Sequence, residues 1–350
     1  MKSYFRPEID ALAGYTPGEQ PKLRRLVKLN TNENPYPPSP RVAEALKEFS
    51  LDDLRRYPDP TADALREDIA AHWVVKRENV ICGNGSMDLL TMIFRAFTDP
   101  ERPAAMFDPC YSLYPVLAAM QEAPVIRMPL DPVTFELARP LAELAKGANL
   151  VVLTRPNAPT GTSAARDEVE SFCAGFDGIV AIDEAYADFA DDNCMEFASK
   201  YDNVLVLRTF SKSYSLAGLR LGYAVGNAVL IDGLMKLKDS YNVDMLTQVV
   251  GRAAFADTDT LAAHTTAVRA TRERLTAELG KLGYTVIPSQ SNFLFASPPD
   301  GDGEGVFKKL RRNAVIVRHF PGEVTGRFVR ITVGTDAETD RLLEVLRGRR

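Results

Sequence analysis

The chain has 350 residues, of which 45% are apolar and 25% charged, a composition that excludes disordered and fibrous classes. Its formal net charge of −5 and sequence pI near 5.5 argue against a nucleic-acid-binding surface, because contacts to phosphates require clustered lysines and arginines. The length predicts about two domains.

The sequence also argues against membrane insertion and secretion. No segment approaches the roughly 18 consecutive apolar residues of a membrane span, and the first 20 residues lack the apolar core of a signal peptide. The four cysteines are widely spaced and the three histidines lack metal-binding spacing, so we expect no disulfide framework and no metal site. We therefore expect a reduced, cytoplasmic protein that binds neither nucleic acid nor a membrane.

The apolar pattern in the first half of the chain predicts alternating strands and helices. Residues 1–39 are irregular and rich in proline, and a helix is predicted from about Arg41. A short strand at 79–82 leads into GNGS, and a helix follows over 86–97 with Ser86 as its N-cap. Further strands are predicted at 104–108, 124–128, 150–154, 178–183 and 203–210. Short apolar strands that alternate with helices predict a mostly parallel sheet covered on both faces.

The pattern changes after about residue 240. A long helix is predicted over roughly 246–282, followed by strands at TVIP and NFLFA, the helix GVFKKLRR, strands at AVIVR and RFVRITVG, and a final helix from about Ala337. We therefore predict an α/β fold with a large domain over 30–240. A smaller α+β domain is predicted from 241–350 together with the N-terminal segment 1–29.

Polar segments follow five of the predicted strands. Ligands of open parallel sheets bind beyond the carboxyl ends of the strands, so these segments are expected to meet in one site. They are GNGSMD, DPCYSLY, TRPNAPTGT, DEAY and TFSKS.

Two of these segments are ambiguous when taken alone. GNGS allows a tight turn into a helix whose free N–H groups would bind an anion, or it is a plain glycine turn. The segment also matches part of a dinucleotide-binding fingerprint, but Asp88 stands where the third glycine is expected, so that signal is weak. Asp183 ends an apolar strand and would need a partner if buried. The nearby Asp188, Asp191 and Asp192 are interpreted as an acidic surface loop rather than a metal site.

Lys212 is either a solvated lysine or a nucleophile. It follows Asp183 by one predicted strand, so both residues are expected at the same edge of the sheet. A desolvated lysine forms Schiff bases, and the nearby Thr209, Ser211 and Arg220 are suitable donors to a phosphate. An amine, phosphate donors and an acidic partner together fit pyridoxal phosphate.

Several motifs in chain order resemble those of fold-type-I pyridoxal-phosphate aminotransferases. These are GNGSMDLL, RPNAPTG, IDEAYADF and RTFSKSYSLAGLRLGYAVG. LNTNENPYPPSP, RRYPDP and VRHFPGEV…RFVRITVG resemble the histidinol-phosphate aminotransferase branch of this family. The resemblance extends from about Tyr15 to the C-terminal helix.

The resemblance implies a role for each matching residue. Lys212 would hold the cofactor as a Schiff base and move a proton, and Asp183 would pair with the ring nitrogen. Tyr186 and Asn157 would bind the ring oxygen, and Tyr111 would stack on the ring. The implied phosphate ligands are Gly85, Ser86, Met87, Thr209, Ser211 and Arg220, with Tyr57 reaching the site of the neighbouring subunit of a homodimer.

The resemblance also implies a substrate site. Arg330 would bind the substrate anion, a carboxylate in glutamate and a phosphate in histidinol phosphate, with Tyr15, Asn157 and Arg318 as further contacts. The chain departs from the family pattern at Arg155 and Ala158, on either side of Pro156-Asn157, and at Met87-Asp88. Arg155 either changes the charge of the site or faces away from it.

The implied reaction is amino transfer between histidinol phosphate and 2-oxoglutarate in histidine biosynthesis. Aromatic amino acid aminotransferases and threonine-phosphate-type decarboxylases share the framework and are alternatives. A nucleotide-binding oxidoreductase built on GNGSMD is disfavoured, because it would leave Lys212, Asp183 and Asn157 without roles. A non-enzymatic regulator is also disfavoured.

Overall fold

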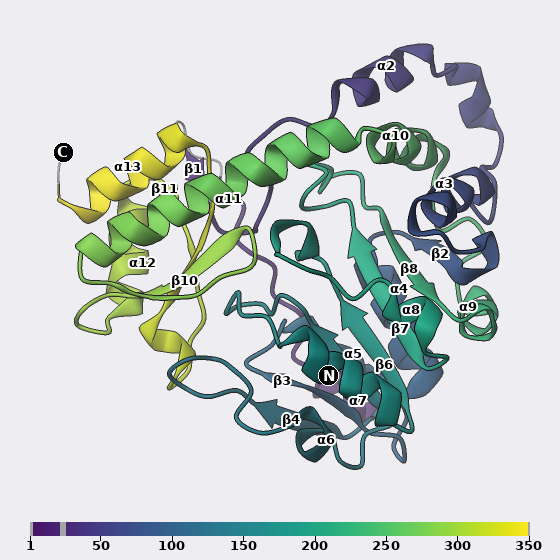
Figure 1. The fold of residues 1–350 in the computed structure, drawn as a ribbon, viewed down its shortest axis with the longest axis horizontal. Helices are drawn as coiled ribbons and strands as arrows, with labels where there is room; N and C mark the ends of the chain where they lie inside the picture. The colour runs from purple at the N-terminus through teal and green to yellow at the C-terminus, as the bar shows by residue number, and fades with distance from the viewer. Residues whose placement is uncertain (1–2, 22–25, 349–350) are drawn as a thin grey trace.

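A seven-stranded sheet forms the centre of the protein. The computed structural model describes residues 3–21 and 26–348, and Figure 1 shows the sheet flanked by helices. The order across the sheet is β2-β8-β7-β6-β5-β3-β4. The strands are β2 (Val80–Gly83), β3 (Ala104–Asp108), β4 (Val125–Pro129), β5 (Leu150–Thr154), β6 (Ile179–Asp183), β7 (Val204–Thr209) and β8 (Gly222–Gly226). The predicted mostly parallel sheet is confirmed.

Strand β8 is the exception, since it runs antiparallel to both of its neighbours. The sequence analysis did not predict this strand. In the structure, a Cβ at Gly222 would lie 2.5 Å from the main-chain nitrogen of Ser86. Glycine therefore allows this strand to pass against the start of the helix that follows β2.

Helices cover both faces of the sheet, because its strands are apolar on both sides. In β5, Val151 and Leu153 belong to one core, and Leu150 and Val152 belong to the other. The first face carries α3 (Asp63–Trp73), α6 (Leu141–Leu144), α7 (Arg166–Gly175), α8 (Phe197–Lys200) and α10 (Met245–Phe255). The second face carries α4 (Ser86–Phe97), α5 (Leu113–Met120) and α9 (Ala228–Met235).

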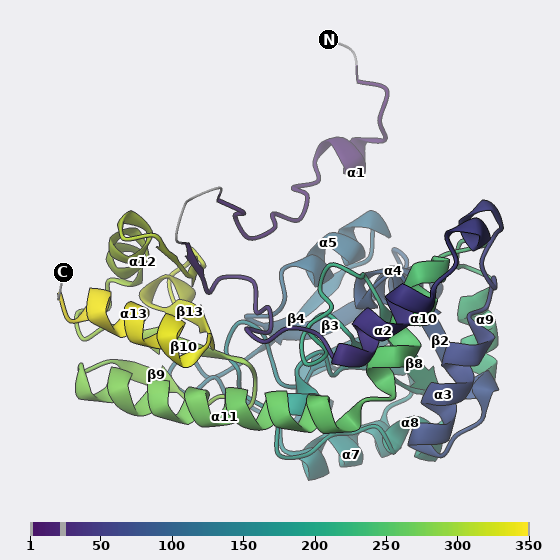
Figure 2. The same ribbon diagram turned by 90° about the horizontal axis from the view of Figure 1, so that it is seen from above.

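A smaller layered unit lies at one end of the large sheet. Its antiparallel sheet has the order β12-β13-β10-β9, and helices α11, α12 and α13 pack around it (Figures 1 and 2). The elements are α11 (Thr258–Lys281), β9 (Thr285–Ile287), β10 (Phe293–Ser297), α12 (Gly303–Arg312), β12 (Arg318–His319), β13 (Val329–Thr332) and α13 (Asp336–Leu346). The single strand predicted at AVIVR is two short strands, because β11 (Val315–Ile316) pairs with the N-terminal β1 (Val27–Lys28) instead.

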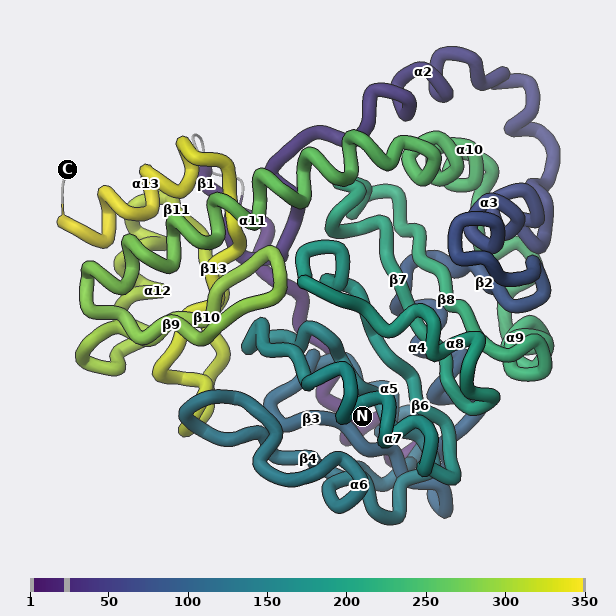
Figure 3. The backbone as a smooth tube through the Cα atoms, viewed as in Figure 1, coloured from purple at the N-terminus to yellow at the C-terminus, as the bar shows by residue number. Residues whose placement is uncertain are grey.

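The N-terminal segment connects the two units. It carries α1 (Pro7–Asp10) and β1, and after β1 it crosses to α2 (Pro40–Glu48) at the far side (Figures 2 and 3). The remaining short helices are η1 (Leu51–Arg55), η2 (Arg77–Asn79), η3 (Ala187–Phe189) and η4 (Thr325–Arg327). The domain boundary near residue 240 stays a prediction from the sequence. Helix α10, which follows that residue, packs beside α2 and α3. None of the helices described here is long and apolar enough to cross a membrane.

The single helix predicted over 246–282 is wrong, because two helices, α10 and α11, occupy this stretch. Asp257 separates them and caps α11, with its side chain accepting hydrogen bonds from the Thr260 main-chain nitrogen at 3.2 Å and the Thr260 hydroxyl at 2.7 Å. The Ser39 hydroxyl, next to α2, donates to the same carboxylate. The break therefore fastens α11 to the start of α2.

We predict that Asp257→Ala lowers the free energy of unfolding by about 1–2 kcal/mol, since an N-cap with several donors is lost. Urea denaturation followed by circular dichroism measures this change. Asp259→Ala, an exposed acidic residue two positions later, is the matched control and should cost at most about 0.5 kcal/mol. Equal losses in the two variants would contradict the capping role.

Candidate active site

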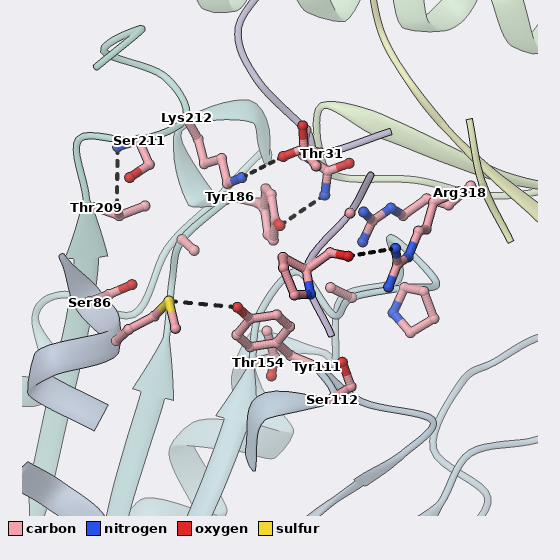
Figure 4. A pocket seen from close by; sticks show the side chains of 18 of the residues that line it. Thr31, Ser86, Tyr111, Ser112, Thr154, Tyr186, Thr209, Ser211, Lys212 and Arg318 are labelled. Atoms are coloured by element: carbon pink, nitrogen blue, oxygen red, sulfur yellow. Dashed lines mark hydrogen bonds between the residues drawn. The ribbon is translucent and has the colours of Figure 1, made fainter. Parts of the chain in front are cut away.

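A cavity of about 230 Å³ lies where the large sheet, the small sheet and the N-terminal segment meet. Figure 4 shows side chains from all three parts pointing into it. Most of the predicted site residues line it: Tyr15, Ser86, Met87, Tyr111, Asp183, Tyr186, Thr209, Ser211, Lys212, Arg220, Arg318 and Arg330. The expected convergence of the strand ends is therefore seen.

The Lys212 amine points into the cavity, and no carboxylate is among its described hydrogen-bond partners, although the charge of Glu33 partly opposes the lowering of its pKa. Its Nζ donates to the main-chain carbonyl of Thr31 at 3.0 Å (Figure 4) and lies 5.7 Å from the centre of the Tyr186 ring. Burial, reinforced by the positive charge of Arg330, lowers the pKa of Lys212 to about 7. Lys212 is therefore an activated amine rather than a solvated one.

Asp183 ends β6 and is buried. Burial raises its pKa, against the hydrogen bonds and the Lys212 charge that favour the ionised form. Its Oδ2 accepts a hydrogen bond from the Tyr114 hydroxyl at 2.7 Å, and its Oδ1 accepts one from the Ala185 main-chain nitrogen at 3.1 Å. The partner that a buried carboxylate requires is therefore mainly Tyr114.

A cradle of donors lies at the start of α4. Gly85 has φ of +80° and holds the N-cap position, so the prediction of Ser86 as N-cap is wrong by one residue. A Cβ at Gly85 would lie 2.6 Å from Nη2 of Arg220. Arg220 Nη1 donates to the Ser211 hydroxyl at 3.2 Å, and the Ser211 main-chain nitrogen donates to Thr209 Oγ1 at 3.1 Å. Free helix N–H groups beside a guanidinium suit a phosphate.

Tyrosine rings line the walls of the cavity. Tyr15 and Tyr111 make an edge-to-face contact with ring centres 5.6 Å apart, and the Tyr111 hydroxyl lies 3.9 Å from Sδ of Met87. The Tyr186 hydroxyl accepts a hydrogen bond from Asn32 Nδ2 at 2.9 Å. The rings leave a flat, partly apolar space that suits an aromatic ligand.

Two arginines lie next to each other on adjacent strands of the small sheet. Arg318 on β12 and Arg330 on β13 are direct cross-strand partners, an unfavourable pairing of like charges. Arg330 Nη2 donates to the Asn30 carbonyl at 2.9 Å, and Arg318 donates to the Thr16 and Pro17 carbonyls at 3.1 and 3.3 Å. Within the described part of the chain neither guanidinium has a carboxylate partner, so the pair is suited to an anionic ligand.

Asn157 and Tyr57 do not line this cavity. Asn157 is buried, and its Nδ2 donates to the Pro109 carbonyl at 3.1 Å and to Thr160 Oγ1 at 3.0 Å. Its Oδ1 is buried with no partner among the described residues. Tyr57 is 79% exposed and stacks on Tyr241 with ring centres 4.4 Å apart. Tyr57 is therefore turned away from the cavity of its own chain.

Arginines pair with the acidic residues after β6. Asp188 accepts from the buried Arg208 at 2.5 Å, Asp192 from the buried Arg155 at 2.5 Å, and Asp191 from Arg269. The prediction of a plain surface loop is therefore incomplete. Arg155 is absent from the cavity lining, so it faces away from the site.

The sequence analysis missed Thr31, Asn32 and Tyr114. Asn32 lies in the quoted LNTNENPYPPSP motif, which signalled a role for this segment without assigning one to the residue. Tyr114 lies in DPCYSLY, and its ring makes an edge-to-face contact with the Tyr111 ring, with centres 5.5 Å apart. Thr31 contributes a main-chain carbonyl, for which residue type carries no signal.

Comparison with known proteins agrees with this geometry. The family described as aminotransferase class I and II matches residues 24–346. Histidinol-phosphate aminotransferase 1 of Bordetella parapertussis is 43% identical over 99% of both chains, and histidinol-phosphate aminotransferase 2 of Thiobacillus denitrificans is 45% identical over 98% of this chain and 97% of its own.

A solved structure is similar as well. Histidinol-phosphate aminotransferase from Sinorhizobium meliloti, in complex with pyridoxal-5′-phosphate, matches with a TM-score of 0.90 and 25% identity over 99% of both chains. The resemblance inferred from the motifs is confirmed. The chain belongs to the aminotransferase class I and II family, among the histidinol-phosphate aminotransferases.

Proposed function

We propose that this protein transfers the amino group between histidinol phosphate and 2-oxoglutarate, in the cytoplasm, with pyridoxal phosphate as cofactor. The aminotransferase predicted from the motifs is confirmed at the level of the family, and the relatives of 40–45% identity carry the histidinol-phosphate aminotransferase name. The observation that carries the substrate assignment is the pair of adjacent arginines, Arg318 and Arg330, which line the cavity and form no ion pair with a carboxylate among the described residues.

The residues present fit pyridoxal phosphate. The cradle of glycine, helix N–H groups and the Arg220 guanidinium matches a phosphate, and buried Asp183 matches a cationic ring nitrogen. The cofactor would form a covalent link to Lys212 and withdraw electrons from the carbon that carries the amino group of the donor. The other lining residues that would hold it are Ser86, Met87, Tyr111, Tyr186, Thr209 and Ser211. Gly85 would admit the phosphate beside Arg220. Asn157 lies outside the cavity lining and would reach the ring oxygen only if its amide gave up its bond to the Pro109 carbonyl.

Lys212 would move the proton of the reaction. Because its pKa is lowered to about 7, its Nζ is largely uncharged just above neutral pH and accepts a proton there. The carbonyl of Thr31 holds the amine in the absence of substrate. We propose that Nζ takes the proton from the donor carbon and later returns it, while the tyrosine walls keep water out.

Arg330 and Arg318 would divide the recognition of the substrate. Arg330 would bind the carboxylate of glutamate or the phosphate of histidinol phosphate, since a guanidinium accepts either anion through two parallel hydrogen bonds. Arg318 and Tyr15 would add contacts that only the doubly charged phosphate uses. A second positive charge also offsets the larger cost of desolvating a phosphate.

We further propose a homodimer in which Tyr57 reaches the cofactor phosphate of the partner. Exposed apolar side chains gather around Tyr57: Leu51 is 78% and Leu54 50% exposed, and Tyr241 stacks on Tyr57. A patch of this kind on one chain is typical of an interface. The symmetric arrangement would place one Tyr57 at each of two sites.

We expect Arg330→Gln to raise the pKa of Lys212, because burial and then the Arg330 charge are the main causes of its lowering. The measurement is the pH dependence of Lys212 acetylation in the protein without cofactor, followed by peptide mass spectrometry. The unmodified protein should show a midpoint near pH 7. Arg318→Gln is the control, since Arg318 is not among the main causes of the shift. An unchanged midpoint in Arg330→Gln would contradict this account.

For the substrate, we expect Arg318→Gln to lower kcat/KM for histidinol phosphate by about 10- to 100-fold, the size of a lost charge-assisted hydrogen bond. The loss for glutamate should be much smaller, whereas Arg330→Gln should impair both donors. Arg312→Gln, an exposed arginine at the end of α12, is the control. Stopped-flow half-reactions with each donor give these values.

The same donors test the reaction itself. Amino transfer from phenylalanine without transfer from histidinol phosphate would overturn the substrate assignment, and release of carbon dioxide without a need for 2-oxoglutarate would indicate a decarboxylase.

Borohydride reduction of the loaded protein followed by peptide mapping should label Lys212. A label on another lysine would contradict its role.

Mixed dimers test the role of Tyr57. Lys212→Ala and Tyr57→Ala chains should each be impaired, yet a mixture should regain activity, because a mixed dimer assembles one site with both native residues. Activity assays before and after subunit exchange measure this gain. The mixture would stay at the average of the two variants if Tyr57 acted within its own chain.

A further inference from the structure

Tyr114 and Thr154 form a buried chain of hydroxyl groups behind Asp183. The Tyr114 hydroxyl lies 2.7 Å from Asp183 Oδ2 and 2.9 Å from Thr154 Oγ1. All three residues line the cavity, and the Tyr114 side chain is fully buried. Nothing in the proposed reaction steps above uses Tyr114 or Thr154.

The fold holds this chain from three directions. Thr154 ends β5 and Asp183 ends β6, and the two are direct neighbours in the parallel register. Tyr114 comes from α5, which packs on one face of the sheet. Figure 4 shows Thr154 next to Tyr111, and both line the cavity. The arrangement therefore rests on two adjacent buried strands and a helix that packs on them.

The direction of the hydrogen bonds follows from the number of protons. An ionised carboxylate only accepts, so the single hydroxyl proton of Tyr114 must be donated to Asp183. The Tyr114 oxygen is then the acceptor for the Thr154 hydroxyl. Because linked hydrogen bonds polarise one another, Thr154 strengthens the bond from Tyr114 to Asp183.

The Tyr114 bond opposes the effect of burial on Asp183. Burial raises the pKa of this carboxyl, and the hydrogen bonds from Tyr114 and Ala185 and the charge of Lys212 lower it. Of these, Tyr114 is a side-chain donor that a substitution removes without touching the main chain. Without it the carboxyl would bind a proton more readily.

We propose that Tyr114, oriented by Thr154, is a positioning residue that keeps Asp183 ionised, so that the proton between Asp183 and the cofactor ring stays on the ring nitrogen. The inference rests on the proposed pyridoxal-phosphate function. A protonated ring withdraws electrons more strongly, so the hydroxyl chain would favour the more electron-withdrawing form of the cofactor.

The test is the nitrogen-15 NMR shift of ring-labelled pyridoxal phosphate bound to the full-length protein. The unmodified protein should show a pyridinium nitrogen. In Tyr114→Phe the proton equilibrium should move about tenfold or more toward the carboxyl, since a hydrogen bond to a charged group is lost. Thr154→Val should cause a smaller shift in the same direction, because it removes the second bond of the chain.

Tyr223→Phe is the matched control. Tyr223 is also buried in the large core, but its hydroxyl accepts from Trp73 Nε1 at 2.9 Å rather than contacting Asp183. It should leave the nitrogen shift unchanged. If Tyr114→Phe failed to fold by circular dichroism, Thr154→Val would decide the question alone.

The outcomes separate the two proposals. If the unmodified protein does not bind pyridoxal phosphate, the proposed function fails. If it binds with a pyridinium nitrogen and the folded Tyr114→Phe and Thr154→Val proteins keep that shift, the hydroxyl chain has no such role. A shift of equal size in Tyr223→Phe would also overturn the inference.

Discussion

The hydrogen bond from Lys212 to the carbonyl of Thr31 joins the parts on which the site depends. The two residues that flank Thr31 contact other site residues: the Asn30 carbonyl accepts a hydrogen bond from Arg330, and the Asn32 side chain donates one to Tyr186. This segment is anchored to the small sheet through Thr332, whose hydroxyl accepts from the Asn32 main-chain nitrogen at 3.0 Å. One short irregular stretch therefore sets the spacing between the lysine, the tyrosine and the substrate arginine.

Local patterns in the sequence predicted most of the large sheet. Continuous apolar runs marked its parallel strands, and the polar segments after them marked the site, because both signals lie within a few neighbouring residues. The pattern failed where tertiary contacts decide. Gly222 in β8 allows close packing against Ser86, and Gly226 allows it against Leu205. An apolar periodicity running through 246–282 concealed the cap at Asp257.

The site residues also divide into those that local sequence motifs identify and those that only tertiary contacts reveal. Lys212, Asp183 and Arg220 stand in motifs that carry their chemistry, so the sequence was sufficient to find them. The hydrogen bonds that position such residues come from distant parts of the chain: Tyr114 lies 69 residues before Asp183, and Asn32 lies 154 residues before Tyr186. Main-chain acceptors such as Thr31 leave no trace in residue type. The arginine partners of Asp188 and Asp192 were likewise hidden, because only the fold brings them together.

The pairing of β1 with β11 has a consequence for how the molecule is made. Val27 pairs with Val315, and Arg330 binds a carbonyl 300 residues earlier in the chain. The strands of the large sheet are all complete by Gly226, so this sheet has its whole sequence available while the ribosome is still producing the small unit. Arg318 and Arg330 follow this sheet in the chain, and contacts this distant in sequence form late. The lysine and the strand ends are therefore synthesised before the small unit that encloses them.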